Sequence, residues 1–164
     1  MSQLVKTLLT AVLVQNDMRY IHWCVTGEDF TKSHILVEKY YYKLDEEIDT
    51  LGELAREKSA KIENPNSALN LIGYTPETQS GYLYLDTVNA CKLKLSLYIN
   101  ELKALRAESE SDVQSSIDEW LRYWNKEVDY KLTQSSNKVL PMNFINTGLD
   151  NALAYRYSSP RVIV

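Results

Sequence analysis

The residues best suited to chemistry are two histidines and a row of carboxylates. The chain of 164 residues contains only two histidines, so their positions limit every metal or acid–base hypothesis. If residues 34–53 are helical, a step of about 100° per residue gives one face free of Lys and Arg that carries His34, Glu38, Asp45, Asp49 and Glu53. The other histidine, His22, precedes a short Gly-containing turn and can fold back toward this face. Imidazole and carboxylate groups together suit iron, zinc or manganese.

Like charges repeat one helical turn apart on this face, at Asp45, Asp49 and Glu53. A solvated helix face usually mixes the two signs at this spacing, because such pairs stabilise a helix by about 0.2–0.5 kcal/mol each. The nearby Lys39 and Lys43 fall on another face. A cation bound between the carboxylates would remove their repulsion. The alternative is an acidic face that is simply exposed to water, and the spacing alone leaves both interpretations open.

Four long helices must position these residues. The apolar spacing predicts them over residues 3–24, 31–61, 79–108 and 112–135, with one short helical turn around 68–72. On the second helix, the predicted core stripe consists of Leu36, Val37, Tyr40, Leu44, Ile48, Leu51 and Leu54. Lys39, Lys43 and Glu46 are expected on a solvated face. Helices of this length favour an all-α antiparallel four-helix bundle.

The chain divides into a bundle and a tail. Residues 1–136 are expected to form the bundle, whereas residues 137–164 break the helical pattern with two prolines and a glycine. This tail is too apolar for a solvated disordered arm. We expect it to dock on its own bundle, with a neighbouring subunit or a partner protein as the alternative.

Charge and cysteine content narrow the class of protein. The net charge of -4 makes the chain a poor direct binder of nucleic acid, since nonspecific affinity comes mainly from cationic side chains. Two cysteines imply no disulfide framework and fit a reducing compartment. The apolar run at residues 4–14 is interrupted by Lys6 and is too short to span a membrane. The expectation is a soluble cytoplasmic protein.

At the candidate site the sequence resembles the Dps family, the DNA-protecting proteins of starved cells, also called miniferritins. The resemblance covers about residues 4–55. It begins with a His-Trp pair, His22 and Trp23, before the turn at Gly27. A second histidine, His34, follows twelve residues after the first, and an acidic residue, Glu38, four residues later. The motif Asp-x-x-x-Glu, formed by Asp49 and Glu53, begins eleven residues after Glu38. Helix order and length agree to about residue 135. No Glu-x-x-His pair, the motif of standard ferritins, occurs in the chain.

The resemblance implies a fold, an assembly and an activity. The fold would be a ferritin-like bundle, and the assembly a homo-oligomer with a dimer as its smallest unit and a dodecamer as its expected size. A metal site between two subunits would take His22, His34 and Glu38 from one chain and Asp49 and Glu53 from the other. These residues would bind Fe(II) and oxidise it with hydrogen peroxide or oxygen. Trp23, beside the site, is expected to pack rather than to donate an electron.

A second hypothesis is a structural or interaction protein on a ferritin-like scaffold. Its metal site would be vestigial or structural, and the tail at 137–164 would be the binding element. DNA is a weaker candidate partner, because no Lys/Arg-rich arm precedes the first helix. Metal analysis combined with the mass of the oligomer separates these hypotheses.

Overall fold

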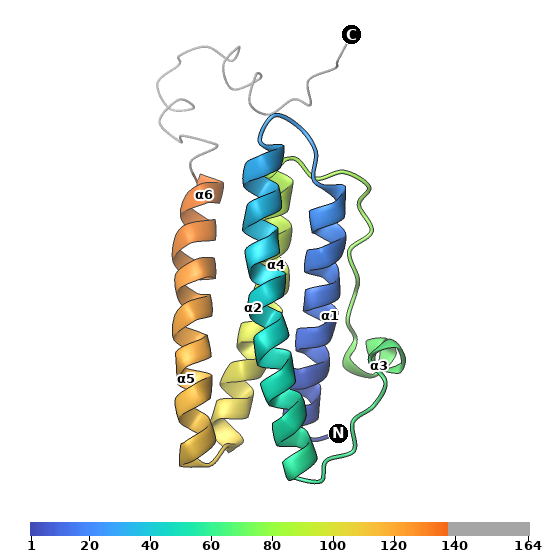
Figure 1. The fold of residues 1–164 in the computed structure, drawn as a ribbon, viewed down its shortest axis with the longest axis vertical. Coiled ribbons are helices and arrows are strands. Elements are labelled where there is room, and N and C mark those ends of the chain that lie inside the picture. Colours follow the sequence, from blue (N-terminus) through green and yellow to red (C-terminus); the bar gives the residue numbers. More distant parts are fainter. Residues whose placement is uncertain (138–164) are drawn as a thin grey trace.

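The computed structural model describes residues 1–137, which form a bundle of four long helices (Figure 1). Three of them are α1 (Gln3–Cys24), α2 (Phe30–Glu57) and α4 (Tyr84–Glu108). The fourth runs without a break through α5 (Ser111–Asn125), a π-helical segment η1 (Lys126–Leu132) and α6 (Thr133–Asn137). The predicted all-α four-helix bundle is confirmed.

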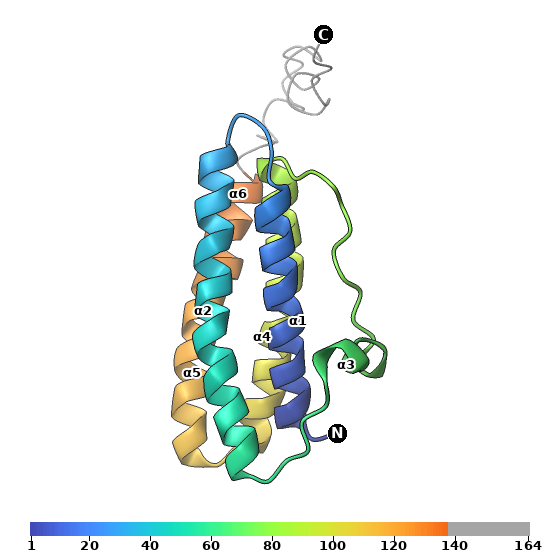
Figure 2. The same cartoon turned by 45° about the vertical axis from the view of Figure 1, so that its right-hand side comes forward.

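The helices do not simply alternate in direction. In Figure 1, α1 and α5 run upward whereas α2 and α4 both run downward. Two consecutive long helices with the same direction require a connection that returns along the whole bundle. Residues 58–83 make this connection on the outside of α1 and carry the short helix α3 (Pro65–Ile72) (Figure 2).

Local chemistry sets the ends of the predicted helices. The hydroxyl of Ser2 caps α1 by accepting the N–H of Val5 at 3.4 Å. α2 ends at Glu57 rather than at 61, because Ser59 has a φ of 53° and the N–H of Ala60 donates to the carbonyl of Ala55 at 2.9 Å. α4 begins at residue 84 rather than 79, since the preceding residues are extended.

The short helix expected around 68–72 is present and longer than predicted. The side chain of Asn64 accepts the N–H of Asn66 at 2.9 Å, and Pro65 occupies the first turn. At the other end Gly73 adopts the left-handed conformation with a φ of 65°. α3 thus has a signal at both ends, and it packs on α1 through the buried Ala68.

The core lies between α1, α2 and α4, with the last helix closing the bundle. α1 is buried on nearly all sides, polar side chains such as Thr7 and Gln15 included, because α2, α4 and α3 all pack on it. Four residues of the predicted stripe on α2 are fully buried: Val37, Tyr40, Leu44 and Leu51. The other three are partly buried: Leu36, Ile48 and Leu54.

The face of α2 expected to be solvated is exposed at Lys39 and Glu46 and partly exposed at Lys43. It also borders the last helix: Lys39 binds the buried carboxylate of Glu127 at 2.8 Å, and the ammonium of Lys43 lies 5.6 Å from the ring centre of Tyr123. A lysine at the edge of a core stripe covers apolar surface with its stem while its charge reaches a partner.

The core also holds a carboxylate that the apolar pattern did not identify. Glu47 on α2 is 1% exposed, and its Oε2 accepts bonds from the hydroxyl of Tyr98 at 2.9 Å and the indole N–H of Trp124 at 2.8 Å. Its Oε1 has no hydrogen-bond partner among residues 1–137, although Nζ of Lys43 lies 3.7 Å away. Burial raises the pKa of Glu47 to about 7, and the hydrogen bonds from Trp124 and Tyr98 oppose the shift.

The predicted docking of the tail at 137–164 concerns residues that, from 138 onward, lie outside the described part of the chain. Both cysteines, Cys24 and Cys91, are free thiols. Among residues 1–137, no helix is both long and apolar enough to cross a bilayer.

Candidate functional site

The two histidines meet at the end of the bundle where α1 turns into α2. His22 lies in the last turn of α1 and His34 in the second turn of α2. Their ring centres are 3.6 Å apart, and the ring of Tyr41 lies 5.3 Å from that of His22. The pairing of the two imidazoles across the Gly-containing turn, expected from the sequence, is therefore observed.

A tight turn over residues 25–29 brings the rings together. Gly27 has a φ of 93°, which only glycine adopts at low cost, and its carbonyl accepts the N–H of Phe30 at 3.1 Å. The turn is paired with residue 82 of the long connection: the N–H of Tyr82 donates to the carbonyl of Cys24, and the N–H of Thr26 to the carbonyl of Tyr82, both at 2.9 Å. The position of His22 relative to α2 thus depends on a residue 60 positions away.

A polar network fixes that part of the connection to the bundle. The hydroxyl of Tyr82 donates to Glu77 at 2.6 Å. Lys94 of α4 binds Glu77 at 3.3 Å and Asp17 of α1 at 3.0 Å, and the hydroxyl of Tyr74 donates to Asp17 at 2.6 Å. Lys94 and Asp17 are each 4% exposed, so these charges are paired inside the protein rather than screened by water.

Substitution of Gly27 by alanine should destabilise the protein. An added Cβ would lie 2.9 Å from Cδ2 of Leu83 on a backbone that L-residues rarely adopt, which costs about 1–3 kcal/mol. Urea unfolding measures the loss. Gly81→Ala is the matched control, because its Cβ would meet only an ordinary contact of 3.8 Å with Thr26. Equal stabilities of the two variants would contradict this account of the turn.

The surroundings of His22 favour its neutral imidazole form. Burial lowers the pKa of His22, the neighbouring His34 lowers it further, and the carboxylate of Glu38 opposes both effects. Both ring nitrogens of His22 are buried and have no hydrogen-bond partner among residues 1–137. A neutral imidazole with an unused lone pair is the form that binds a metal ion, so the donor chemistry of this end fits a metal such as iron.

The acidic residues of the predicted set divide into two groups. Glu38 lies one turn from His34, and its charge acts on His22. Asp49 and Glu53 are both exposed on the same helix, 15 and 19 positions beyond His34, which is about 22 and 28 Å along an α-helix. One chain therefore does not bring them to the histidines. Within residues 1–137 no three His, Cys, Asp or Glu side chains are grouped so that they could hold a metal ion.

Asp45 has partners inside its own chain. The side-chain amide of Gln15 donates to it at 2.6 Å, and Arg19 lies 3.5 Å away. No Lys or Arg of α2 lies on its acidic face, but Arg19 of α1 supplies a cation at Asp45. Asp49 and Glu53 make no ion pair with any of the described residues, and the like charges of the face remain unbalanced at these two positions.

Several large apolar side chains on the same two helices as the imidazole pair are exposed. Trp23 is 74% exposed, Ile35 and Tyr42 are each 59% exposed, and Phe30, with its ring 5.1 Å from that of His34, is 45% exposed. Trp23 therefore does not pack against the described part of its own chain, contrary to the expectation. Exposed large apolar side chains near a site are compatible with an interface when they form one patch.

Solved structures of other proteins have the same fold. The chain superposes on antigen TpF1 from Treponema pallidum with a TM-score of 0.74 and 22% identity, over 82% of this chain and 88% of that one. It superposes on CAIP from Helicobacter cinaedi with a TM-score of 0.73 and 15% identity, over 82% of this chain and 96% of that one. It superposes on Dps from Staphylococcus aureus with a TM-score of 0.70 and 15% identity, over 82% of this chain and 92% of that one. No protein-family model and no curated protein matches the sequence. The predicted resemblance to Dps is thereby confirmed at the level of the fold, a ferritin-like four-helix bundle.

Proposed function

We propose that the chain is a miniferritin that binds Fe(II) between two of its copies, oxidises it, and stores the iron inside a homo-oligomer. The observation that carries this proposal is the imidazole pair of His22 and His34, with ring centres 3.6 Å apart and both nitrogens of His22 buried without a partner among residues 1–137. The pair needs further ligands that its own chain does not bring close. The Dps-like fold supports iron as the substrate metal.

A second copy supplies what one chain lacks. The same face of α2 carries the histidine end at residue 34 and the acidic end at residues 49–53, about 22 Å apart. In a two-fold contact the same patch serves on both subunits, so the histidine end of each chain faces the acidic end of the other. The exposed Trp23 and Tyr42 become buried in such a contact. Two equal sites result, each with donors from both chains.

Each ligand type has a distinct role in the chemistry. His22 and His34 hold Fe(II), for which imidazole is a suitable ligand. The hard carboxylate oxygens of Glu38, and those of Asp49 and Glu53 of the second copy, favour Fe(III). When hydrogen peroxide is the oxidant, it accepts one electron from each of two Fe(II) ions and, with two protons, becomes two molecules of water. Iron oxidation without hydroxyl radicals protects a cell against oxidative damage.

The assembly and its location follow from this proposal. A dimer is the smallest unit that completes a site, and a closed shell of about twelve chains, the size that the resemblance implies, is the expected store. A soluble cytoplasmic protein fits this role. DNA has only weak support as a partner, and a mobility shift measured across salt concentrations tests it.

A structural or interaction role on the same scaffold is the second candidate. The observation that favours it is the absence, within residues 1–137 of one chain, of any group of three metal-binding side chains. An oligomer that forms without iron binding would support this role, with the segment at 137–164 as the binding element.

Anaerobic titration with Fe(II), followed by peroxide, tests the proposed function. Replacement of both His22 and His34 by alanine should weaken iron binding by at least about tenfold, the loss typical even for residues that merely support a metal ligand. The variant should keep its helical circular dichroism and its oligomer mass, because His22 is only partly buried. Unchanged iron binding in this variant would refute the proposal.

A matched control uses two acidic residues of the same helix that lie off the site. Glu46 pairs only with Lys43 among the described residues, and Glu57 is exposed near the end of α2. Glu46→Gln combined with Glu57→Gln removes two charges from α2 and should leave iron binding at the level of the parent protein. The control matches Asp49→Asn combined with Glu53→Gln, which also removes two charges from α2; equal losses of iron binding in these two variants would assign the effect of the acidic residues to net charge rather than to ligands.

A further inference from the structure

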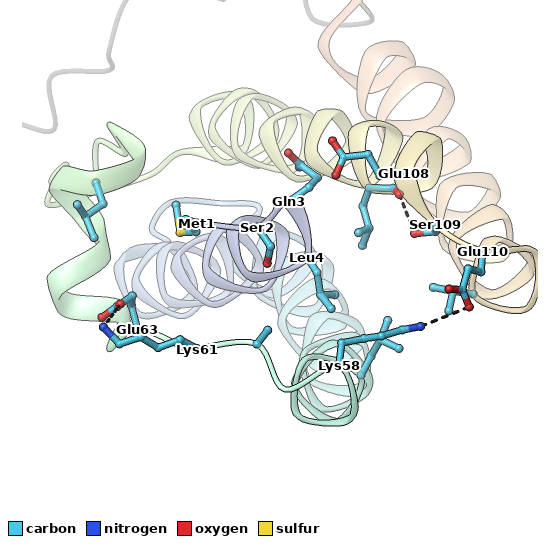
Figure 3. Close-up of a pocket in the computed structure, with 15 residues that line it drawn as sticks. Met1, Ser2, Gln3, Leu4, Lys58, Lys61, Glu63, Glu108, Ser109 and Glu110 are labelled. Carbon is cyan, nitrogen blue, oxygen red and sulfur yellow. Dashed lines mark hydrogen bonds and ion pairs between the residues drawn. The ribbon is translucent and has the colours of Figure 1, made fainter.

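The two ends of the bundle are built differently. At the end away from the histidines, a pocket of about 850 Å³ lies between the start of α1, the end of α2 and the corner of α4 and α5 (Figure 3). At its rim, Nζ of Lys58 lies 3.4 Å from the carboxylate of Glu110. None of the proposed iron ligands lines this pocket. The imidazole pair is supported at its own end, by residues 82–84, where the long connection enters α4.

The backbone of Tyr82 holds the end of α1. Its N–H donates to the carbonyl of Cys24, two positions after His22, and its carbonyl accepts the N–H of Thr26, both at 2.9 Å. Tyr82 is 1% exposed, so it is fixed by packing as well as by these bonds. The direction in which the chain leaves α1 therefore depends on the position of Tyr82.

The next two residues contact the turn and the start of α2. Nζ of Lys32, two positions before His34, lies 3.7 Å from the ring centre of Tyr84, which is a cation–π contact. Cδ2 of Leu83 lies so close to the turn that a Cβ on Gly27 would meet it at 2.9 Å. One short segment thus contacts the chain on both sides of the imidazole pair.

The hydroxyl of Tyr82 anchors this segment to the bundle. It donates to the carboxylate of Glu77 at 2.6 Å, and an ionised acceptor makes such a bond about twice as strong as a neutral one does. Glu77 is held in turn by Lys94 of α4 at 3.3 Å and, through its own N–H, by Asp17 of α1 at 3.0 Å. The hydroxyl therefore connects the turn to two long helices.

His22 lacks the support that metal-binding histidines usually have. Such a ring is commonly oriented by a hydrogen bond from the nitrogen that does not bind the metal. Both ring nitrogens of His22 are buried and have no hydrogen-bond partner among residues 1–137. The position of the ring must therefore come from the backbone at the end of α1, which Tyr82 holds.

We propose that Tyr82 is a positioning residue of the iron site: the bond from its hydroxyl to Glu77 holds the imidazole of His22 against that of His34. This role rests on the proposed binding of iron at the two histidines. Tyr82 does not touch the metal and acts through the backbone that follows His22. The two rings are then in place before a metal ion arrives, which lowers the cost of binding.

Tyr82→Phe tests this role, because it removes the hydroxyl and keeps the buried ring. Anaerobic titration should show Fe(II) bound at least about tenfold more weakly, the loss typical of residues that support a metal ligand. Co(II) is the second probe, since its visible absorption reports the geometry of its ligands. The Co(II) spectrum at saturating metal should differ from that of the parent protein, a change that a fall in stability alone does not cause.

Tyr74→Phe is the matched control. The hydroxyl of Tyr74 also donates to a carboxylate at 2.6 Å, that of Asp17, and the ring of Tyr74 lies 4.8 Å from Nζ of Lys94. Within the described part of the chain, Tyr74 makes no hydrogen bond to residues 24–27. This variant should lose stability as Tyr82→Phe does, but it should keep the Fe(II) affinity and the Co(II) spectrum of the parent protein.

Two variants of Glu77 repeat the test from the side of the acceptor. Glu77→Gln and Glu77→Ala both remove the charge that faces Lys94, but only glutamine leaves an oxygen that can accept the hydroxyl of Tyr82. Glu77→Gln should therefore bind Fe(II) at least about fivefold more tightly than Glu77→Ala does.

Equal Fe(II) affinities and Co(II) spectra of Tyr82→Phe and Tyr74→Phe would overturn this role, whether both variants match the parent protein or both fall below it. Equal affinities of the two Glu77 variants would overturn it as well. In both cases the proposed function stands if the parent binds Fe(II) through its histidines. Fe(II) binding that does not depend on His22 and His34 would refute the proposed function, and this role with it.

Discussion

The free energy of unfolding of the protein should fall by about 3 kcal/mol between pH 4.5 and 7 because Glu47 loses its proton. Replacement of Glu47 by glutamine should remove this fall. The size follows from the pKa of Glu47, which is raised from 4.5 to about 7 in the folded protein, because each pKa unit is worth about 1.4 kcal/mol. A group that is 1% exposed has little solvent screening to reduce the effect. The free energy of unfolding at pH 8 should accordingly be higher in the variant.

The sign follows from the direction of the shift. A raised pKa means that the folded protein holds the proton of Glu47 more tightly than the unfolded chain does. Protonation therefore stabilises the fold fully below pH 4.5, and this contribution is lost as the pH rises to about 7. Glutamine is neutral at every pH, so the variant does not lose this contribution.

The geometry lets glutamine replace the carboxylate closely. Its carbonyl oxygen can accept the bonds that Tyr98 and Trp124 now donate at 2.9 and 2.8 Å. Its amide then takes the place of Oε1, which has no hydrogen-bond partner among residues 1–137. Glutamine does not reproduce the ionic attraction between Glu47 and Lys43, whose charged atoms lie 3.7 Å apart, and this reduces the gain in stability at high pH.

Urea unfolding of both proteins from pH 5 to pH 8 measures the difference. The comparison isolates Glu47, because the two proteins differ only at this side chain. Glu46→Gln is the control, since Glu46 has a side chain that is 73% exposed, and its curve should stay parallel to that of the parent. Parallel curves for Glu47→Gln and the parent would contradict the assignment of a buried, proton-binding carboxyl.

Helical spacing places Glu47 on the buried face of α2, although its charge suggests an exposed position. Glu47 lies three residues after Leu44 and four before Leu51, on the stripe that forms the core. Its position therefore signalled burial, but its charge and its neighbour Glu46 suggested surface. The donors that stabilise it, Tyr98 and Trp124, come from α4 and α5, and single-helix periodicity contains no information about them.

The helix ends show the same division between local and distant causes. The start of α1 and both ends of α3 follow from capping residues that can be read locally. The late start of α4 does not, because the residues before it are held extended through the pairing of Tyr82 with Val25. That pairing joins residues 57 positions apart, and only the folded chain brings them together.

The candidate site was predictable to the extent that it lies within one chain. The spacing of His22, Gly27 and His34 correctly predicted that the two imidazoles meet. The place of Asp49 and Glu53 depends on a second copy, and helix geometry shows only that they are too far from the histidines of their own chain. Their role as ligands therefore remains a prediction.

Mixing two inactive variants should restore iron oxidation. One variant carries His22→Ala and His34→Ala, and the other carries Asp49→Asn and Glu53→Gln. Each assembly alone should oxidise Fe(II) at least about ten times more slowly than the parent, because every site lacks either its histidines or its second-copy carboxylates. In a mixed pair, the histidines of one chain meet the carboxylates of the other in one of the two sites.

Differently tagged chains, co-expressed in equal amounts, make this the most direct test of a site shared between two copies. Random pairing in a two-fold dimer leaves about a quarter of all sites intact. The mixed assembly should therefore recover about a quarter of the parental rate of Fe(II) oxidation by peroxide. A mixed assembly no more active than its two parents, or an Asp49→Asn/Glu53→Gln variant as active as the parent protein, would contradict the account.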